Sequence, residues 1–276
     1  MRIRAGYTIS YDCPNPVPML LLLSLHPSRE GDLLTPQAMQ FDPPLDAQPY
    51  KDDFGNVCHR IVAPKGSMTV SMLFDIEDSG LPDRVDPGAK QIPVEELPSG
   101  TLVYLLGSRY CDTDLLHDVA WSLFGNTEPG WARVQAICDF VHERITFGYE
   151  HARPNKTARN AYDERQGVCR DFAHLGVALC RCMNIPARYC TGYLGDIGVP
   201  PVDAPMDFSG WFEAFLDGAD GPRWYTFDAR HNKPRIGRIL MGRGRDATDV
   251  ALVTNFGVAW LTKFDVVTYE LTGETA

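Results

Sequence analysis

The segment from Arg165 to Asn184 constrains the fold of this chain more than any other. Its apolar residues recur at helical spacing after Cys169 and Ile185-Pro186 follows them, which predicts a buried, rigid helix that begins at the cysteine. Gly167 supplies a turn just before it. Backbone N–H groups at a helix start carry a partial positive charge, so they favour a thiolate over a thiol and can hold a developing oxyanion. This arrangement predicts that Cys169 is a nucleophile.

A lone cysteine at such a position would more often be a small buried hydrophobe, so the interpretation depends on the motifs around it. Several stretches agree, in order and spacing, with the core of one family. They are Gly167-Val168-Cys169-Arg170-Asp171-Phe172-Ala173, Ile185-Pro186-Ala187-Arg188-Tyr189, Gly210-Trp211-Phe212-Glu213-Ala214-Phe215 and Trp224-Tyr225-Thr226-Phe227-Asp228. Over roughly residues 130–249 the chain resembles the bacterial transglutaminase-like superfamily, and the part before Tyr110 resembles the β-rich N-terminal region of the same proteins.

The resemblance implies a papain-like site, in which a cysteine at a helix start faces a histidine and an aspartate on an antiparallel sheet. By motif position Cys169 is the nucleophile and Asp228 orients the imidazole. The family commonly places its histidine two residues before Trp211, where this chain has Ser209. A hydroxyl is not basic enough near neutral pH to take the proton of a thiol. Either His231 supplies the imidazole from the loop after Asp228, or the site has lost its base and the chain is a catalytically degenerate peptide-binding module.

Three other histidines compete poorly for the role of the base. His174 lies five residues after Cys169, about 140° around the helix, so it should point away from the thiol. His142 is expected on the surface of another helix, beside Glu143. His151 precedes an extended polar connection and is harder to exclude, although we expect it too to be an ordinary exposed or satisfied histidine.

The chemistry that these residues predict is acyl transfer on amide bonds. The Cys169 thiolate attacks a carboxamide or peptide carbonyl, an imidazole oriented by Asp228 protonates the departing amine, and water or a second amine releases the acyl group. We expect hydrolysis, as in a cysteine peptidase or amidase, because the resemblance is to the bacterial superfamily and the sequence has no EF-hand-like calcium loop. Transfer to an amine, as in a transglutaminase, is the alternative. No cofactor or metal is expected, and the partner is a peptide or protein amide. The residues predicted to contact it are Ser209, Trp211 and Tyr162.

Charge and cysteine usage bear on other classes of protein. A net charge of −10 disfavours nucleic acid, whose phosphates would be repelled. The basic stretch from Lys233 to Arg245 is a local exception and is predicted to be a solvated loop, with a rim that attracts acidic peptides or cell-wall carboxylates as the alternative. Cys180 and Cys182 should face nearly opposite sides of a helix, so a zinc site with Cys190 is not expected.

Cysteine placement and hydropathy predict where the protein resides. The 8 cysteines fall mainly within predicted helices and strands of a chain long enough to need no disulfides, which is typical of a reducing compartment. The long aliphatic run at residues 19–25 is far shorter than the roughly 20 residues that a bilayer span needs, and no cleavage site follows it. We therefore expect a soluble cytoplasmic protein with no membrane partner.

The order of the predicted elements indicates an α+β fold in two parts. Residues 1–100 are expected to form a β-rich sandwich or barrel followed by a linker, because short strands alternate with Pro and Gly clusters. Residues 101–276 are expected to form the transglutaminase-like core, with helices packed on an antiparallel sheet.

Within that core, a hairpin is expected to assemble the site. Residues 211–216 and 224–227 should pair across a loop rich in turn residues, which would place Asp228 close to Ser209 at one end of the sheet. Strands between residues 250 and 271 are expected to extend the same sheet.

Overall fold

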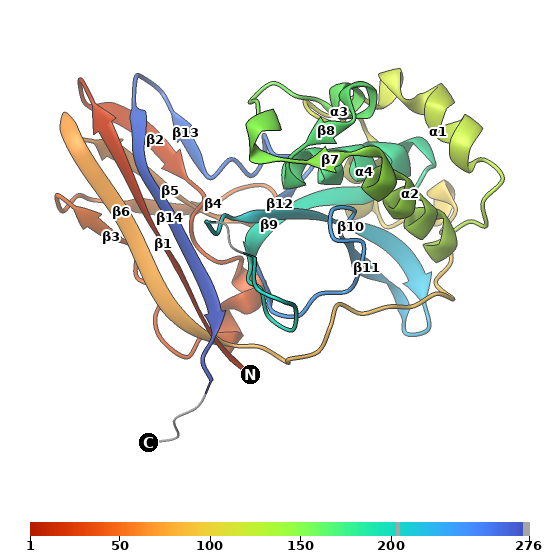
Figure 1. The fold of residues 1–276 in the computed structure, drawn as a ribbon, viewed down its shortest axis with the longest axis horizontal. Helices are drawn as coiled ribbons and strands as arrows, with labels where there is room; N and C mark the ends of the chain where they lie inside the picture. The colour runs from red at the N-terminus through yellow and green to blue at the C-terminus, as the bar shows by residue number, and fades with distance from the viewer. Residues whose placement is uncertain (203–204, 273–276) are drawn as a thin grey trace.

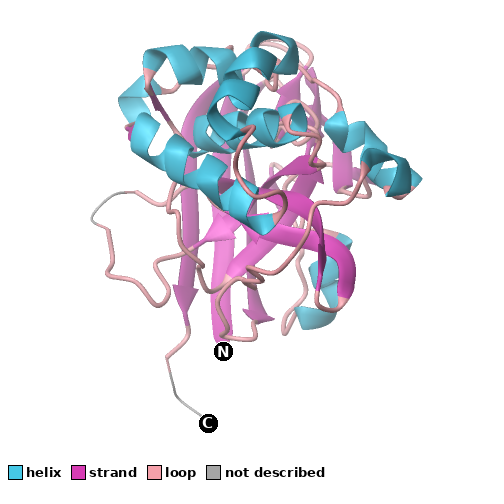
Figure 2. Cartoon of the chain, turned by 90° about the vertical axis from the view of Figure 1, so that its right-hand side faces the viewer, coloured by secondary structure: helices cyan, strands magenta, loops and turns pink. Residues whose placement is uncertain are grey.

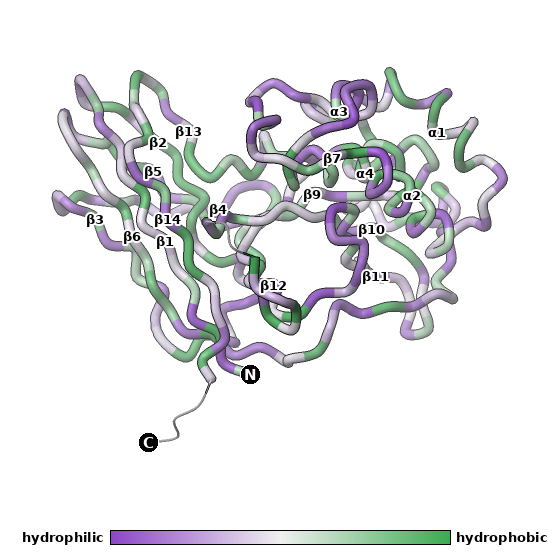
Figure 3. Tube along the Cα trace, viewed as in Figure 1, coloured by the Kyte–Doolittle hydropathy of each residue, from purple (hydrophilic) through white to green (hydrophobic). Residues whose placement is uncertain are grey.

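Apolar and polar residues alternate along the strands of the N-terminal half, and this alternation builds a β-sandwich. In β1 (Arg2–Cys13) the side chains of Ile3, Ala5 and Ile9 are fully buried, and the residues between them face the other side of the sheet. The protein is described by a computed structural model that covers residues 1–202 and 205–272. Figure 1 shows the sandwich as the layers of strands on the left, and Figure 3 shows hydrophobic and hydrophilic residues mixed along them.

Two four-stranded antiparallel sheets make up the sandwich. The first has the strand order β14-β1-β6-β3 and the second has the order β13-β2-β5-β4. The strands are β2 (Val17–Leu21), β3 (Gln40–Asp42), β4 (Gln48–Lys51), β5 (Val57–Ala63), β6 (Gly66–Glu77), β13 (Val253–Asn255) and β14 (Trp260–Glu270). The β-rich N-terminal part is therefore confirmed as a sandwich.

The strands β13 and β14 return to this sandwich from the C-terminal end of the chain. β14 pairs with β1, with Ile3 opposite Glu270, and β13 pairs with β2. The prediction that residues 250–271 extend the sheet of the C-terminal half is therefore wrong. A strand is identified in a sequence by alternation with a period of two, and this alternation does not show which sheet the strand joins. Here β14 pairs with the edge of β1 and β13 pairs with the edge of β2.

The C-terminal half contains a second kind of layer, an antiparallel sheet that we call the core sheet, with the order β11-β10-β9-β12. Its strands are β9 (Ala187–Leu194), β10 (Ser209–Gly218), β11 (Gly221–Phe227) and β12 (Arg238–Gly244). β10 and β11 form the predicted hairpin, with Phe212 opposite Phe227. The hairpin ends β11 one residue before Asp228.

Helices cover one face of the core sheet, as Figure 2 shows from the side. They are α1 (His117–Phe124), preceded by the short helix η4 (Thr113–Leu115), α2 (Trp131–Arg144), α3 (Ala158–Glu164) and α4 (Cys169–Cys182). α4 packs directly on β10, and a Cβ atom at Gly176 would lie 2.8 Å from the ring of Phe212. Within residues 1–202 and 205–272, no helix has both the length and the apolar character that a bilayer crossing requires.

The opposite face of the core sheet is covered by the connection between the two halves. This connection contains η2 (Val94–Glu96) and η3 (Ser99–Leu105), and its residues Ile92 and Leu97 pack against Phe215 and beside Trp224. The short helix η1 (Pro27–Asp32) of the N-terminal half also reaches this side, where Nη1 of Arg29 donates to the carbonyl of Arg238 at 2.8 Å.

The basic stretch is structured, so the prediction of a solvated loop is wrong. Part of it forms β12, and the side chains of Arg235 and Arg238 are only 4% and 8% exposed. Arg238 lies between two carboxylates, with Nε 2.9 Å from Asp83 and Nη2 2.8 Å from Asp228. Both acids come from other segments, so a local charge pattern could not reveal that these cations are buried.

Candidate active site

Cys169 is the first residue of α4, and its position is built by the residues just before the helix. β8 (Gln166–Gly167) pairs in parallel with β7 (Thr146–Phe147) and brings the chain to the helix start. Val168 is extended, and its N–H donates to Oδ2 of Asp171 at 3.0 Å, which caps the first turn. A Cβ at Gly167 would lie 2.7 Å from the same oxygen, so this close approach requires glycine.

The sulfur of Cys169 lies in a mixed electrostatic environment. Cys169 is partly exposed, whereas the other seven cysteines are buried. Burial of the sulfur raises the pKa of the Cys169 thiol to about 11, and the carboxylate of Asp207 adds to this effect. The guanidinium of Arg230 and the backbone N–H groups of Gly210 and Arg170 act in the opposite direction.

Burial of the sulfur therefore favours the thiol at neutral pH, against the predicted effect of the helix start, which favours the thiolate. The favourable N–H groups are present, as the helix start predicted, but desolvation of the sulfur outweighs them. The Cys169 proton has to be removed by a base when substrate binds.

Alkylation of Cys169 by iodoacetamide should rise about tenfold per pH unit and level off only near pH 11, because the thiolate is the reactive form and its fraction follows the pKa. The Arg230→Gln variant should react several-fold more slowly at pH 8, since it loses the nearby positive charge. Peptide mass spectrometry after timed labelling measures the pH dependence and the rate of the variant. Arg223→Gln, which removes an exposed arginine, is the matched control. A plateau near pH 7, or equal rates in the two variants, would contradict this electrostatic account.

Asp228 follows β11 and is almost fully buried, with 3% of its side chain exposed. Its Oδ1 accepts the backbone N–H groups of Arg230 and His231, each at 3.0 Å. Its Oδ2 accepts from Nη2 of Arg238 at 2.8 Å and lies 2.9 Å from Nδ1 of His231. Burial alone would raise the pKa of Asp228, but the charge of Arg238 and the bonds from His231 hold it well below the usual range.

The structure therefore brings the predicted pair of Asp228 and His231 together. A proton on Nδ1 of His231, donated to the carboxylate, leaves Nε2 as the nitrogen that exchanges protons. The His231 side chain is 21% exposed, so this nitrogen is not sealed in the core. That His231 serves Cys169 as its base stays a prediction.

Ser209 begins β10, and its hydroxyl is buried without a hydrogen-bond partner among the residues described. The next residue, Gly210, directs its N–H toward the sulfur of Cys169. By strand alternation Ser209 shares a face with Trp211, whose ring centroid lies 5.1 Å from the guanidinium of Arg238. Position 209 is therefore next in sequence to a residue that contacts the sulfur of Cys169, and it shares a sheet face with a residue beside Arg238.

The other predicted contact residues are committed to packing. Trp211 is 2% exposed and faces the side of the sheet away from α4. The ring of Tyr162 lies under the guanidinium of Arg144 at 3.7 Å and beside Phe140, which joins α3 to α2. Their role in substrate binding stays a prediction.

Two of the competing histidines are explained by structural roles. His174 is fully buried, and its Nε2 accepts the backbone N–H of Ala247 at 3.1 Å. His142 is exposed, as expected, but its Nδ1 also lies 2.8 Å from the carbonyl of Arg230 and so helps to hold the turn after Asp228.

Three further residues lie near Cys169, and two of them, Arg230 and Asp207, were not predicted. Arg230 stacks on Phe147 with its guanidinium carbon 3.8 Å from the ring centroid, and its charge acts on the sulfur. Tyr149, in η5 (Tyr149–His151), lies near both Cys169 and Asp207, and burial raises the pKa of Asp207. Arg230 lies two residues after Asp228 and Asp207 lies two residues before Ser209. This proximity to the motifs was the only sequence feature that could have pointed to them.

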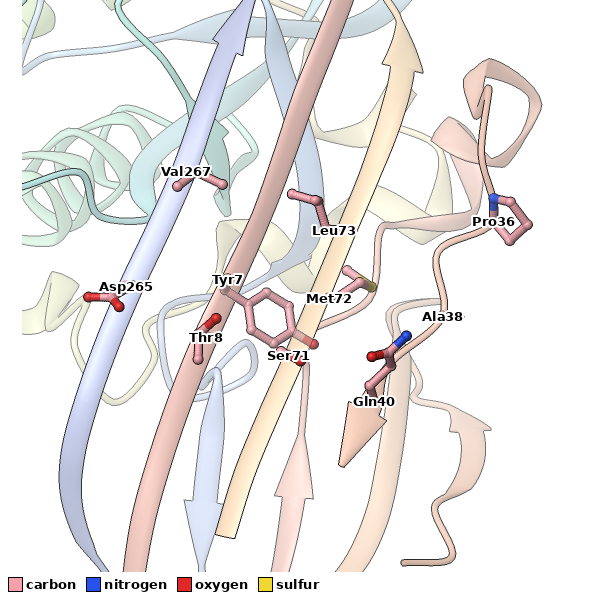
Figure 4. Close-up of a pocket in the computed structure, with 10 residues that line it drawn as sticks. All are labelled: Tyr7, Thr8, Pro36, Ala38, Gln40, Ser71, Met72, Leu73, Asp265 and Val267. Atoms are coloured by element: carbon pink, nitrogen blue, oxygen red, sulfur yellow. The ribbon is translucent and has the colours of Figure 1, made fainter. Parts of the chain in front are cut away.

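A cavity of about 380 Å³ lies away from these groups, on the N-terminal sandwich (Figure 4). β1, β6, β14 and the segment at residues 36–40 line it, and its polar side chains include Thr8, Ser71 and Asp265. None of its lining residues is a cysteine or a histidine, so the cavity offers no nucleophile of the predicted kind.

Comparison with known proteins agrees with this geometry. The family described as the Transglutaminase-like superfamily matches residues 118–229, which include Cys169, Ser209 and Asp228. An uncharacterized protein of Mycobacterium leprae is 27% identical over 217 residues, which is 73% of this chain and 73% of that protein. An uncharacterized protein of Mycobacterium tuberculosis is 25% identical over 232 residues, or 77% of this chain and 73% of that protein.

A crystal structure from Cytophaga hutchinsonii, described as a "putative cysteine protease", superposes with a TM-score of 0.82 and 29% sequence identity. The match covers 100% of this chain and 92% of that one, so it includes the sandwich, the core sheet and the helices together. Residues 118–229 of the chain therefore form a transglutaminase-like domain, within a fold shared with that protein.

Proposed function

We propose that the protein catalyses cysteine-dependent acyl transfer on amide bonds, with water as the acceptor, as a cysteine peptidase or amidase. The observation that carries this proposal is the position of Cys169, a partly exposed cysteine at the first residue of α4 with two backbone N–H groups and Arg230 around its sulfur. The match of the whole fold to the Cytophaga structure supports it.

In this proposal His231 is the base and Asp228 orients it. Nε2 of His231 takes the thiol proton, and the sulfur of Cys169 forms a bond to the carbonyl carbon of the substrate. The N–H groups of Arg170 and Gly210 stabilise the oxyanion. The C–N bond then breaks, and the imidazolium gives its proton to the leaving amine. Water attacks the thioester, which releases a carboxylic acid and restores the thiol.

A second candidate, a peptide-binding module without catalysis, has two observations in its favour. Ser209 occupies the position where the family commonly has histidine, and the pKa of the Cys169 thiol is raised by burial to about 11. A protein of this kind would bind peptides and form no thioester.

Incubating the protein with a pool of glutamine-containing and peptide amides should produce a Cys169 thioester, visible by intact mass after acid quench. Peptide mapping should locate the added mass at Cys169. Water as acceptor then gives free acid, whereas added alkylamine gives a substituted amide if the protein is a transglutaminase. Binding of peptides without either product would favour the binding module.

A cytoplasmic location is part of this proposal. All 8 cysteines are free, including the buried ones, which is the usual state in a reducing compartment. A reducing compartment would also protect the catalytic thiol from oxidation.

A further inference from the structure

A cavity of about 310 Å³ lies on the face of the core sheet that α4 does not cover. β10 contributes Trp211 and β12 contributes Arg238 and Arg243, while the start of the connection and η1 close the other side. Arg29 and Arg235 also line it, so four arginines meet at one cavity. Its volume lies within the range of small-molecule sites.

The acidic residues of this cavity are already paired with arginines. The pairs are Asp83 with Arg238 (2.9 Å), Glu213 with Arg188 (2.6 Å) and Asp78 with Arg29 (3.4 Å). Arg235 is 4.0 Å from Asp196, and the Arg243 side chain forms no hydrogen bond or ion pair with a residue that the structure describes. Nη2 of Arg235 also donates to the carbonyl of Gly195 at 2.9 Å, and the charge of Glu213 acts on Arg243. Arg243 is thus the arginine of the cavity whose side chain has no direct acceptor among the described residues.

Two buried N–H donors of the cavity also have no acceptor within the described chain. They are Nη1 of Arg238 and Nε of Arg235. The two side chains are only 8% and 4% exposed. A buried, charged donor without an acceptor is costly, so most such groups in proteins meet a partner. An acceptor from outside the chain would satisfy them.

Arg235 and Arg238 repel one another, and Arg243 is repelled by Arg188, which lies outside the cavity lining. Burial lowers the pKa of Arg235, with a further contribution from the charge of Arg238. Burial lowers the pKa of Arg243, with a further contribution from the charge of Arg188. An anion bound in the cavity beside these guanidinium groups would offset both effects.

We propose that this cavity binds a small oxyanion, a phosphate or carboxylate group, through Arg235, Arg238 and Arg243. Planar guanidinium groups form paired, charge-assisted hydrogen bonds to such anions. The site is separate from Cys169, because the cavity lies on the side of the sheet opposite α4 and neither Cys169 nor His231 lines it.

The proposed site is connected to Asp228 through one side chain. Arg238 holds Asp228 with Nη2 at 2.8 Å and leaves Nη1 without an acceptor. An anion on Nη1 attracts the same guanidinium that orients Asp228, which in turn binds His231. Anion binding is therefore expected to change the environment of the His231 ring.

Isothermal titration with inorganic phosphate and with malonate, each compared with chloride at equal ionic strength, tests the proposal. We expect one saturable site for an oxyanion below about 10 mM, a concentration at which nonspecific screening is small. Arg243→Gln should weaken it about tenfold or more, whereas Arg223→Gln, an exposed residue outside the cavity, should not. Binding of phosphate alone identifies a phosphate ligand, and binding of malonate alone identifies a carboxylate ligand.

The proposal is overturned if neither anion binds more than chloride, or if Arg243→Gln binds as tightly as the native chain. If Arg243→Gln does not fold, Arg243→Lys replaces it, because lysine keeps the charge but cannot form two parallel hydrogen bonds to one anion. An anion affinity of Arg243→Lys equal to that of the native chain would also overturn the proposal. NMR of the His231 ring, assigned with His231→Asn, tests the coupling, which is overturned if saturating anion leaves that signal unchanged. Binding requires no turnover, so its failure is distinct from failure of the acyl-transfer proposal.

Discussion

Replacement of Cys169 by alanine is expected to abolish amide-bond turnover, lowering kcat/KM by about a thousandfold or more. The sulfur is the atom that forms the thioester, and no other cysteine can replace it because the other seven are buried. The rate of product release and the mass of the acyl-enzyme are both measured, and both should disappear.

The control for this variant is Cys58→Ala, a buried cysteine in the N-terminal sandwich. It should retain the native rate, apart from a modest loss of stability. Peptide affinity should survive in Cys169→Ala because the change removes only the sulfur atom. Undiminished turnover in Cys169→Ala would remove the acyl-transfer proposal altogether.

Replacement of Ser209 by histidine is expected to raise amide hydrolysis by about 10² to 10⁴ fold, the usual contribution of a placed general acid and base. The neighbours of position 209 belong to the candidate site. Gly210 directs its N–H at the sulfur of Cys169, and Trp211 lies on the same face as Ser209 beside the arginine that holds Asp228. Gly192 lies opposite Ser209 and adds no side chain of its own.

Asp228 is the one obstacle to this gain. Its four hydrogen bonds come from Arg238, from the backbone N–H of Arg230 and from the backbone and ring of His231, so an imidazole at position 209 must displace one of them. The rate of Ser209→Ala serves as the matched control and should equal that of the native chain. If Ser209→His folds, as judged by circular dichroism, and is no faster than Ser209→Ala, position 209 is not the place of the missing base.

The His231→Asn substitution separates the two candidate bases. In the native chain, loss of the His231 ring by His231→Asn should remove activity if it serves Cys169. In Ser209→His the same change should have a smaller effect, because the new imidazole replaces it.

Local sequence features predicted the parts of the site that depend on local structure. The apolar period after Cys169 predicted a helix that the structure begins at that residue, and the turn residues after β10 predicted the hairpin that leads to Asp228. The interval of three residues also predicted that His231 could reach Asp228. Each of these depends on neighbours within a few residues.

Features that depend on distant residues were predicted poorly. Desolvation of the Cys169 sulfur is set by the surrounding chain and not by the helix start, and it reverses the expected preference for thiolate. Burial of Arg238 depends on Asp83, which is 155 residues away. The destination of β14 depends on the free edge of β1 at the other end of the chain.

The sequence by itself determined the helix with its leading cysteine, the hairpin, the acid that follows it and the absence of the family histidine at position 209, because each is a matter of residue identity and short-range periodicity. Only the tertiary structure decided the protonation of the thiol, the bonds that saturate Asp228, the sheet that the last strands join and the arginine-lined cavity. Burial, electrostatic pairing and strand partners depend on which distant segments meet, and that information is present only in the folded chain.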